Sequence, residues 1–320
     1  MYTDVYAFAT RKAVKLTVTV KENEMDIKKS GMVAIVGRPN VGKSTLINAL
    51  AGEKIAIVSD KPQTTRNRIC GIINRNSTQY VFMDTPGIHT PKSHLGEYMV
   101  KVAGDAMSDV DAVIMMVAPI AKIGTAEEEI IARINRSKVP AILLINKIDT
   151  VEKADIIPVI EAYSAKYEFD AIIPVSAFKG DGLDLIYDEL DKFIPEGDAL
   201  FPEDMVSDQP EKQMVAEIIR EKLLRLLNHE IPHGTAVEIT RFTERDNGII
   251  DVVATIYCER ESHKGIIIGK RGAMLKKIGE RARCDIERFM GTKVYLETWV
   301  KVKENWRDND VLIKNFGYEI

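Results

Sequence analysis

One short stretch limits what this chain can fold into more than any other. Residues 32–36 form an apolar run, and Gly37 and Gly42 then bound a loop that ends in Lys43 and Ser44. Apolar residues at helical spacing follow directly. Two glycines at this spacing before Lys-Ser, between a strand and a helix, are typical of a loop that binds nucleotide phosphates. The first half of the chain is therefore expected to fold around a nucleotide.

The residue types in this loop suit that chemistry. Glycine allows the backbone to approach a phosphate closely, and the N–H groups that begin a helix favour an anion. Lys43 can reach the β- and γ-phosphate oxygens, and the Ser44 hydroxyl can bind magnesium. A chance match in an ordinary turn is the alternative, but the required strand and helix are both visible. The residues expected to contact the nucleotide here are Gly37, Arg38, Pro39, Asn40, Val41, Gly42, Lys43, Ser44 and Thr45.

The chain is long enough, at 320 residues, for two domains with separate cores. Between 31 and 195, strands alternate with helices, which predicts an α/β domain whose mostly parallel sheet is covered on both faces. A stretch rich in proline and acidic residues breaks this alternation at 196–210 and is the expected linker. The expected strands lie at 32–36, 69–74, 79–83, 112–117, 141–145 and 171–175, and the expected helices at 96–107, 126–136, 155–167 and 183–193.

The two remaining segments differ in character. Residues 211–320 are predicted to form an α+β domain. Its helix is expected at 211–228 and its strands at 236–242, 249–258 and 293–303, around a second helical stretch. Residues 1–30 are expected to form an N-terminal arm, in which alternating apolar residues at 14–20 allow one strand.

Composition excludes several classes of protein. The longest apolar runs, at 112–119 and 141–145, are far shorter than the roughly 18 residues of a membrane span. Cys70, Cys258 and Cys284 show no paired spacing, which favours a reducing compartment and excludes a disulfide or zinc framework. We expect these thiols to be buried and the protein to be soluble and cytoplasmic.

A second cluster of polar residues follows the strand expected at 79–83. Asp84 can hold the water shell of magnesium, and the Gly87 amide, which no side chain shields, can meet the γ-phosphate. The same residues can also form an ordinary turn at a strand end, but the phosphate-binding loop upstream favours the nucleotide. The residues assigned to this cluster are Asp84, Thr85, Pro86, Gly87 and Ile88.

A third cluster follows the strand expected at 141–145. Guanine presents two adjacent donors that one carboxylate can accept, whereas adenine presents no such pair. Asp149 is therefore predicted to select guanine through charge-assisted hydrogen bonds. Asn146 can order the loop and contact the base, and the stem of Lys147 can lie across the base. After the next strand, the small residues Ser176 and Ala177 let their backbone approach the guanine carbonyl.

The second domain carries a separate motif. Gly269 and Gly272 bracket two basic residues between an apolar helix end and an amphipathic helix, which is the form of the loop of a type II KH domain. Such a loop presses its backbone against the phosphates of about four nucleotides of single-stranded RNA. The segment 264–288 holds eight basic and three acidic residues, which suits an anionic partner, although a solvated face of a packing unit is the alternative. The residues predicted to bind RNA are Ile268, Gly269, Lys270, Arg271, Gly272, Lys276 and Lys277.

In this order, the motifs resemble the Era family of ribosome-associated GTPases, within the translation-factor-like GTPases. The matching stretches are GRPNVGKS at 37–44, QTTR at 63–66, DTPG at 84–87, NKID at 146–149, SA at 176–177 and the glycine-bracketed loop. The resemblance covers residues 31–320 and leaves the arm at 1–30 unassigned. It implies a domain that binds GTP with magnesium and hydrolyses it to GDP, followed by a KH RNA-binding domain.

The resemblance also implies catalytic roles. Thr64 and Thr65 belong to the first switch loop, where one hydroxyl completes the magnesium coordination, and we favour Thr65. Ile88, in the second switch loop, occupies the position at which a glutamine would orient the attacking water, so we expect slow intrinsic hydrolysis. Relatives with a hydrophobic residue there use the loop asparagine, here Asn40, to help bind a potassium ion. The expected magnesium ligands are Ser44, Thr65 and Asp84, and the expected catalytic set is Asn40, Lys43, Thr65 and Gly87.

The partners implied by the resemblance are the 3′ end of 16S rRNA and the small ribosomal subunit, whose maturation the protein would assist. The resemblance also implies some peripheral association with the cytoplasmic face of the cell membrane, and we expect a monomer. Two alternatives stay open: a constitutive RNA-binding protein whose nucleotide is structural, and a signalling GTPase that places its basic helix on anionic lipid. Asp149 disfavours an ATP-driven nucleic-acid motor.

Overall fold

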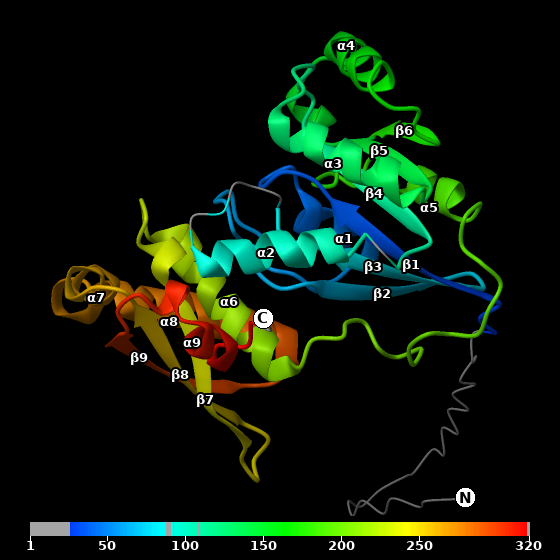
Figure 1. Ribbon diagram of the computed structural model, residues 1–320. Coiled ribbons are helices and arrows are strands. Elements are labelled where there is room, and N and C mark those ends of the chain that lie inside the picture. The colour runs from blue at the N-terminus through cyan, green and yellow to red at the C-terminus, as the bar shows by residue number, and fades with distance from the viewer. Residues whose placement is uncertain (1–25, 88–90, 92, 108, 319–320) are drawn as a thin grey trace, which may run out of the picture.

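The computed structural model describes residues 26–87, 91, 93–107 and 109–318, which form two domains joined by a linker (Figure 1). The first domain contains a six-stranded sheet with the order β2-β3-β1-β4-β5-β6. Neighbouring strands are parallel except for β2, which is antiparallel to β3. The strands are β1 (Lys29–Val36), β2 (Ile69–Arg75), β3 (Thr78–Asp84), β4 (Ala112–Val117), β5 (Ala141–Ile145) and β6 (Ala171–Pro174). The helices are α1 (Lys43–Ala51), α2 (His94–Asp105), α3 (Thr125–Ser137), the 3-10 turn η1 (Ile148–Thr150), α4 (Lys153–Ser164) and α5 (Leu183–Leu190).

Burial explains why these segments form a central sheet. Every residue of β4 and β5 is buried, as expected for parallel strands that helices cover on both faces. One face packs against α1 and α5, through Leu46 and Leu190. The other face packs against α2, α3 and α4, through Ala103, Ile130 and Val159. The carboxyl ends of the parallel strands therefore meet at one edge of the sheet, where ligands bind in such folds.

The second domain is an α+β unit with a three-stranded sheet in the order β7-β8-β9. Strand β7 (Ala236–Glu244) is antiparallel to β8 (Ile250–Cys258), which is parallel to β9 (Val294–Val302). Helices α6 (Glu211–Leu226) and α8 (Ala273–Met290) share one core with the sheet, in which Ile218, Ile256 and Ala282 are fully buried. The remaining elements are η2 (Pro232–Gly234), α7 (Glu261–Ile268), η3 (Lys270–Gly272), η4 (Trp306–Asp308) and α9 (Asp310–Asn315).

The segment predicted as a linker is ordered along the first domain. The Ile72 amide donates to the carbonyl oxygen of Val206, and the Cys70 amide donates to the Asp208 carboxylate. The linker therefore covers the outer edge of β2, whose backbone groups would otherwise be left for pairing with another chain.

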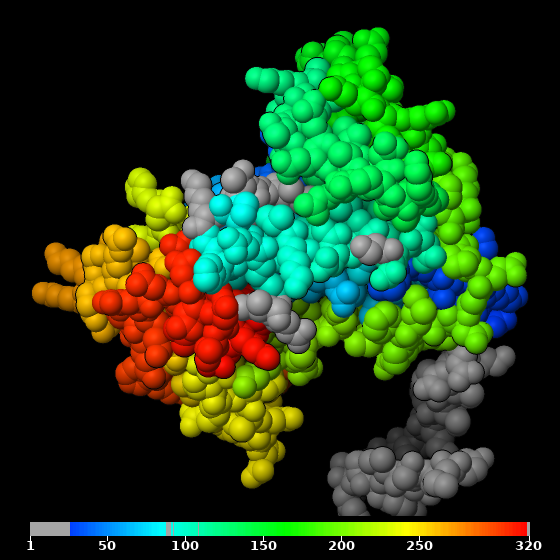
Figure 2. Space-filling view, in the orientation of Figure 1, coloured from blue at the N-terminus to red at the C-terminus, as the bar shows by residue number. Residues whose placement is uncertain are grey.

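The two domains also touch directly. Figure 2 shows the C-terminal segment, in red, against α2, in cyan. Leu95 and Met99 of α2 belong to one buried cluster with Trp306 and Phe316 of the second domain. The second domain is thus packed on the helix that follows the second predicted switch loop. None of the helices in the described ranges combines the length and apolar character needed to span a membrane.

The predicted fold class is confirmed, since an α/β domain with a mostly parallel sheet precedes an α+β domain. Strands β4 and β5 have the predicted bounds, whereas helix ends differ from prediction by up to three residues because periodicity does not mark where caps fall. Strand β1 begins at Lys29, two residues before the predicted domain start. No prediction covered η4 and α9, and the strand predicted at 14–20 lies outside the described residues.

The expectation of three buried cysteines is wrong for one of them. Cys70 and Cys258 lie in strands and are buried, but Cys284 is exposed. It lies on the solvent side of α8, whose buried stripe is formed by Ile278, Ala282 and Ile286. A cysteine in an amphipathic helix takes the environment of its position, not of its residue type.

Candidate nucleotide and nucleic-acid sites

The phosphate-binding loop joins β1 to α1, as its pattern predicts. A Cβ atom at Gly37 would lie 2.4 Å from the carbonyl oxygen of Met116, and one at Gly42 would lie 2.3 Å from Nδ2 of Asn146. Packing inside the protein therefore requires both glycines. The sequence had explained them by the approach of a phosphate alone, because neither neighbour is close in the chain.

Lys43 lies inside this loop. Its Nζ donates to the carbonyl oxygens of Gly37 and Arg38, both at 3.1 Å, and the side chain is buried. Burial lowers the pKa of Lys43 to about 8, and the nearby Asp84 carboxylate opposes that shift. An ammonium group held at this point faces the space that the loop encloses, where phosphate oxygens would lie.

Three oxygen-bearing side chains converge beside Lys43. Ser44 Oγ lies 2.8 Å from Thr65 Oγ1 and donates to Asp84 Oδ2 at 2.6 Å, while Thr65 Oγ1 donates to the same oxygen at 3.1 Å. Asp84 is fully buried, and its Oδ1 has no hydrogen-bond partner among the described residues. Burial raises the pKa of Asp84, and Lys43 and the two hydroxyls oppose that change. Hard oxygen donors with an unsatisfied carboxylate oxygen fit magnesium.

A cavity between the phosphate-binding loop and the segment at 58–65 shows which further residues face this site. Its lining residues from outside the loop are Val58, Ser59, Gln63, Thr64, Thr65 and Gly87. The QTTR motif was a signal for Gln63, whereas Val58 and Ser59 were marked only as the start of a polar loop expected at 58–68 and were not assigned to the site. A Cβ atom at Gly87 would lie 2.6 Å from the backbone N of Pro39, so Gly87 packs directly on the loop. Ile88, which was assigned here, lies outside the described residues.

The base-selecting cluster is built around Asn146. Its Nδ2 donates to the carbonyl oxygen of Val41 at 2.8 Å, and its Oδ1 accepts from the Ala177 amide at 2.9 Å. Both ends of the buried side chain are thus used to tie the phosphate-binding loop to the strand-end loop after β6. Ser176 Oγ donates to Asp149 Oδ1 at 2.7 Å, which orients an exposed carboxylate.

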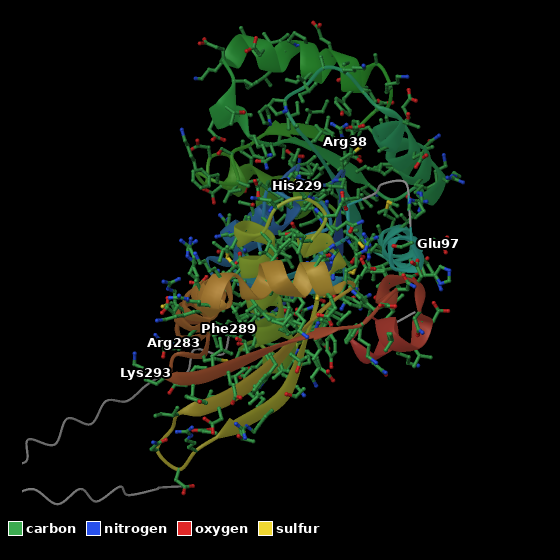
Figure 3. The ribbon with its side chains drawn as sticks, turned by 90° about the vertical axis from the view of Figure 1, so that its left-hand side faces the viewer. Arg38, Glu97, His229, Arg283, Phe289 and Lys293 are labelled. Carbon is green, nitrogen blue, oxygen red and sulfur yellow. The ribbon has the colours of Figure 1, made fainter. Side chains whose placement is uncertain are left out.

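The remaining predicted contacts of the first domain are structural in part. Lys147 Nζ donates to the carbonyl oxygen of Asn40 at 2.7 Å. Arg38 is labelled in Figure 3. Its Nε lies 2.6 Å from the buried Glu127 carboxylate of α3, so this side chain supports the loop from outside. Thr85 Oγ1 donates to the carbonyl oxygen of Ile35 and is fully buried, which ties β3 to β1. Pro39 and Thr45 line the cavity, and Pro86 is buried.

The glycine-bracketed loop of the second domain joins α7 to α8. Gly269 ends α7 with φ +71°, Arg271 has φ 53°, and Gly272 precedes α8 with φ +79°. A Cβ atom at Gly269 would lie 2.7 Å from Cβ of Met274, whereas one at Gly272 would meet nothing within 4 Å. The left-handed backbone explains both glycines, and the space beside Gly272 is open to a ligand.

A groove runs from this loop between α8 and β9. Its lining residues are Gly272, Leu275, Lys276, Gly279, Glu280, Arg283, Leu296 and Thr298. Of the residues predicted to bind RNA, Gly272 and Lys276 line this groove, whereas Ile268, Gly269, Lys270, Arg271 and Lys277 do not. Lys270, Arg271 and Lys277 are exposed cations beside it. The residues predicted to bind RNA did not include Gly279, Arg283, Leu296 or Thr298. Helical spacing from the loop could have indicated Gly279 and Arg283, which lie on α8. No sequence signal links Leu296 and Thr298 of β9 to the loop.

The fold and these two sites define a P-loop nucleotide-binding domain joined to a KH-type nucleic-acid-binding domain. Comparison with family models agrees: residues 32–147 match a family described as 50S ribosome-binding GTPase, and residues 230–307 match the KH domain. GTPase Era of Ruminiclostridium cellulolyticum is 53% identical over 91% of this chain and 98% of its own length. GTPase Era of Clostridium kluyveri is 50% identical over 91% of this chain and 99% of its own length. The chain therefore belongs to the Era family of GTPases.

Solved structures lead to the same family. A crystal structure of Era with MgGDPNP and nucleotides 1506–1542 of 16S ribosomal RNA superposes with a TM-score of 0.88, at 42% identity over 92% of this chain and 100% of that one. A structure of an Aquifex aeolicus Era variant with GDP·AlF4− has the same TM-score and identity, over 91% of this chain and 100% of that one.

Proposed function

We propose that this chain is a magnesium-dependent GTP switch that binds the 3′ end of 16S rRNA and assists maturation of the small ribosomal subunit. The observation that carries the nucleotide half is the meeting of Ser44, Thr65 and Asp84 beside Lys43, with one carboxylate oxygen left unsatisfied. The crystal structure of a family member with MgGDPNP and 16S rRNA supports both halves.

In this proposal, Ser44, Thr65 and Asp84 hold the magnesium ion, Asp84 through the ion's water shell. The chemistry that a bound magnesium ion supplies is neutralisation of charge on the β- and γ-phosphate oxygens. Lys43 and the Gly87 amide bind the γ-phosphate. Thr65, and not Thr64, is the metal-binding threonine, because Thr64 Oγ1 donates to the carbonyl oxygen of Lys61 at 2.7 Å and is engaged within its own loop.

Asp149 selects guanine in this proposal by accepting the two donors of the base, and the hydrogen bond from Ser176 sets the direction of the carboxylate. Asn146 acts by ordering the site, because both ends of its amide are bonded to the backbone. The backbone of Ala177 and the stem of Lys147 complete the base pocket.

Slow hydrolysis stimulated by potassium also belongs to the proposal. Asn40 Nδ2 donates to the carbonyl oxygen of Asp60 at 2.6 Å, so the side chain already faces the first switch loop. The remaining amide oxygen and backbone carbonyls of that loop are suitable potassium ligands. A potassium ion bound there would supply positive charge in place of a residue that orients water.

RNA binding is assigned to the glycine-bracketed loop and the groove beside it. The open space at Gly272 allows close approach of a sugar-phosphate backbone, while Leu275 and Leu296 offer apolar surface to bases. Lys270, Arg271, Lys276 and Lys277 add electrostatic attraction. In the cell we place the protein in the cytoplasm as a monomer, with peripheral association at the cytoplasmic face of the membrane, and we divide it into domains at 31–195 and 211–320.

Two measurements on the full chain test this proposal. GTP turnover should require magnesium and should be lost on chelation, whereas ATP should neither bind nor turn over. Sequencing of RNA crosslinked to the chain loaded with a non-hydrolysable GTP analogue should recover the 3′ end of 16S rRNA. Equal uptake of ATP and GTP would overturn the nucleotide assignment, and crosslinks spread evenly over RNA would overturn the ribosomal one.

A further inference from the structure

The residue that completes the proposed magnesium site is held in place by the other domain. Thr65 lies in a loop that runs between the phosphate-binding loop and helix α6 of the second domain. Its hydroxyl meets Ser44 and Asp84 on one side. Its two neighbours in the chain, Thr64 and Arg66, both bond to the second domain.

The first attachment is made by Arg220 of α6. The side chain is 1% exposed, and Glu217 on the same helix fixes it through Nε at 2.8 Å and through a second bond to Nη2. The other guanidinium contacts go to the switch loop: Nη2 donates to the carbonyl oxygen of Thr64, and Nη1 donates to that of Gln63 at 3.4 Å. The planar guanidinium of Arg220, which Glu217 holds in one orientation, thus fixes the backbone directly before Thr65.

The second attachment is made by Arg66, whose side chain is buried among residues of the second domain. Its guanidinium is buried and donates to the carbonyl oxygens of Thr235 and His233, both at 2.8 Å, and to Tyr318 Oη at 3.1 Å. It lies 5.6 Å from the ring centre of Trp306 and 5.8 Å from that of Tyr318. These hydrogen bonds all go to neutral oxygens, so this buried cation depends on the docked domain for its solvation.

The start of the loop is attached in the same way. Glu221, which follows Arg220 and is 1% exposed, accepts from the Val58 amide at 3.1 Å and from Lys54 at 2.7 Å. Arg225, one turn later, donates to the carbonyl oxygen of Val58 at 2.8 Å. One face of α6 therefore serves both ends of the segment at 58–65, while the opposite face packs into the core of the second domain.

We propose that Arg220 and Arg66 are positioning residues for GTP hydrolysis, through which the RNA-binding domain holds Thr65 where its hydroxyl meets Ser44 and Asp84. This inference rests on the proposed function and adds a direction of control. Binding of magnesium and GTP to Thr65 favours the docked domain, and by linkage the docked domain favours the competent metal site. An RNA that pulls the second domain away from the loop would slow hydrolysis, and one that presses it into place would accelerate hydrolysis.

The test is a double-mutant cycle between Arg220 and Thr65, measured as magnesium-dependent GTP turnover by the full chain. Arg220→Met should lower kcat about tenfold, because a small displacement of a positioned group costs that much or more. The magnesium concentration for half-maximal rate should rise. In the Thr65→Ala background, Arg220→Met should change kcat by less than about twofold, since the group it positions is already gone.

Two further measurements separate positioning from general damage. GDP affinity should stay unchanged in Arg220→Met, because the phosphate-binding loop and Asp149 remain intact. Arg245→Met is the matched control: Arg245 also makes an ion pair within the second domain, with Asp251 at 2.6 Å, but lies in the β7–β8 turn. Its kcat should equal that of the unmodified chain.

Each outcome of the cycle has a distinct meaning. An equal loss from Arg220→Met with and without Thr65, or an equal loss from Arg245→Met, would overturn the positioning role. If Thr65→Ala hydrolyses GTP as fast as the unmodified chain, the proposed magnesium site itself is wrong. Should Arg220→Met not fold, because Glu217 is left buried without its partner, Arg220→Lys keeps the charge and must show the same non-additivity.

Discussion

The nucleotide site and the RNA site of this chain are built on opposite principles. In the first, Lys43, Asp84 and Asn146 are almost wholly inaccessible and are held by hydrogen bonds within the protein, Lys43 and Asn146 to the backbone and Asp84 to two hydroxyls. In the second, Gly269, Arg271 and Gly272 have positive φ, while the side chains of Lys270 and Arg271 are exposed to solvent. Single substitutions should therefore have large effects at the buried site and small, salt-dependent effects at the exposed one.

The largest effect is expected from Asp84→Asn. The substitution keeps the shape but removes the charge that the buried oxygen donors offer to magnesium, so GTP turnover should fall by about 10² to 10³. Turnover measured against magnesium concentration checks this, with Asp204→Asn, an exposed residue of the linker, as the control. An unchanged magnesium requirement in Asp84→Asn would show that the carboxylate does not face the ion.

Asp149→Asn should change the choice of base and leave the phosphate grip intact. Loss of one charged acceptor that serves two donors should weaken GTP binding about a hundredfold, since each hydrogen bond to a charged group contributes about 1.5–3 kcal/mol. The asparagine amide can instead donate to the second carbonyl of xanthine, so xanthosine triphosphate should bind better than GTP. Competition binding with GTP, xanthosine triphosphate and ATP measures this. Equal weakening for all three would mean that Asp149 only supports the loop.

The pKa of Lys43 gives a smaller effect that depends on pH. In the free protein the ammonium group loses its proton above about pH 8, because burial lowers its pKa. Bound phosphates stabilise the charged form, so binding takes up a proton above that pH and weakens by up to about tenfold for each unit of pH. Conversely, the unfolded chain binds more protons than the free folded chain between about pH 8 and the ordinary pKa of 10.5, so the stability of the nucleotide-free protein should rise with pH there. GTP titrations from pH 7 to 9.5 check the first statement, and a flat affinity would contradict it.

The two sites also differ in how far the sequence could predict them. Ser44 and Asp84 belong to recognisable motifs after β1 and in the last position of β3, so the order of the strands could bring them together, whereas Thr65, in the loop before β2, was placed there only by the resemblance to the Era family. The sequence could not predict which residues fix the backbone next to Thr65. Arg220 is more than 150 residues away and belongs to a helix whose pattern indicates only core packing. Leu296 and Thr298 of β9 could not be predicted for the same reason. They line the groove with α8 residues because β9 pairs with β8 in a register that the sequence does not reveal.

The smallest effect is expected at the exposed site. Lys270→Ala with Arg271→Ala should weaken single-stranded RNA binding and reduce the slope of log affinity against log salt by about 0.7 for each phosphate that the variant no longer neutralises. Neither residue lines the cavity of the nucleotide site, so GTP turnover without RNA should stay unchanged in the same variant. Arg241→Ala, which removes an exposed cation from β7 outside the groove, is the matched control and should leave the salt slope unchanged. A variant that loses RNA affinity equally at all salt concentrations would show that the loop acts through its backbone shape alone, because contacts between fixed charges and phosphates always release counterions.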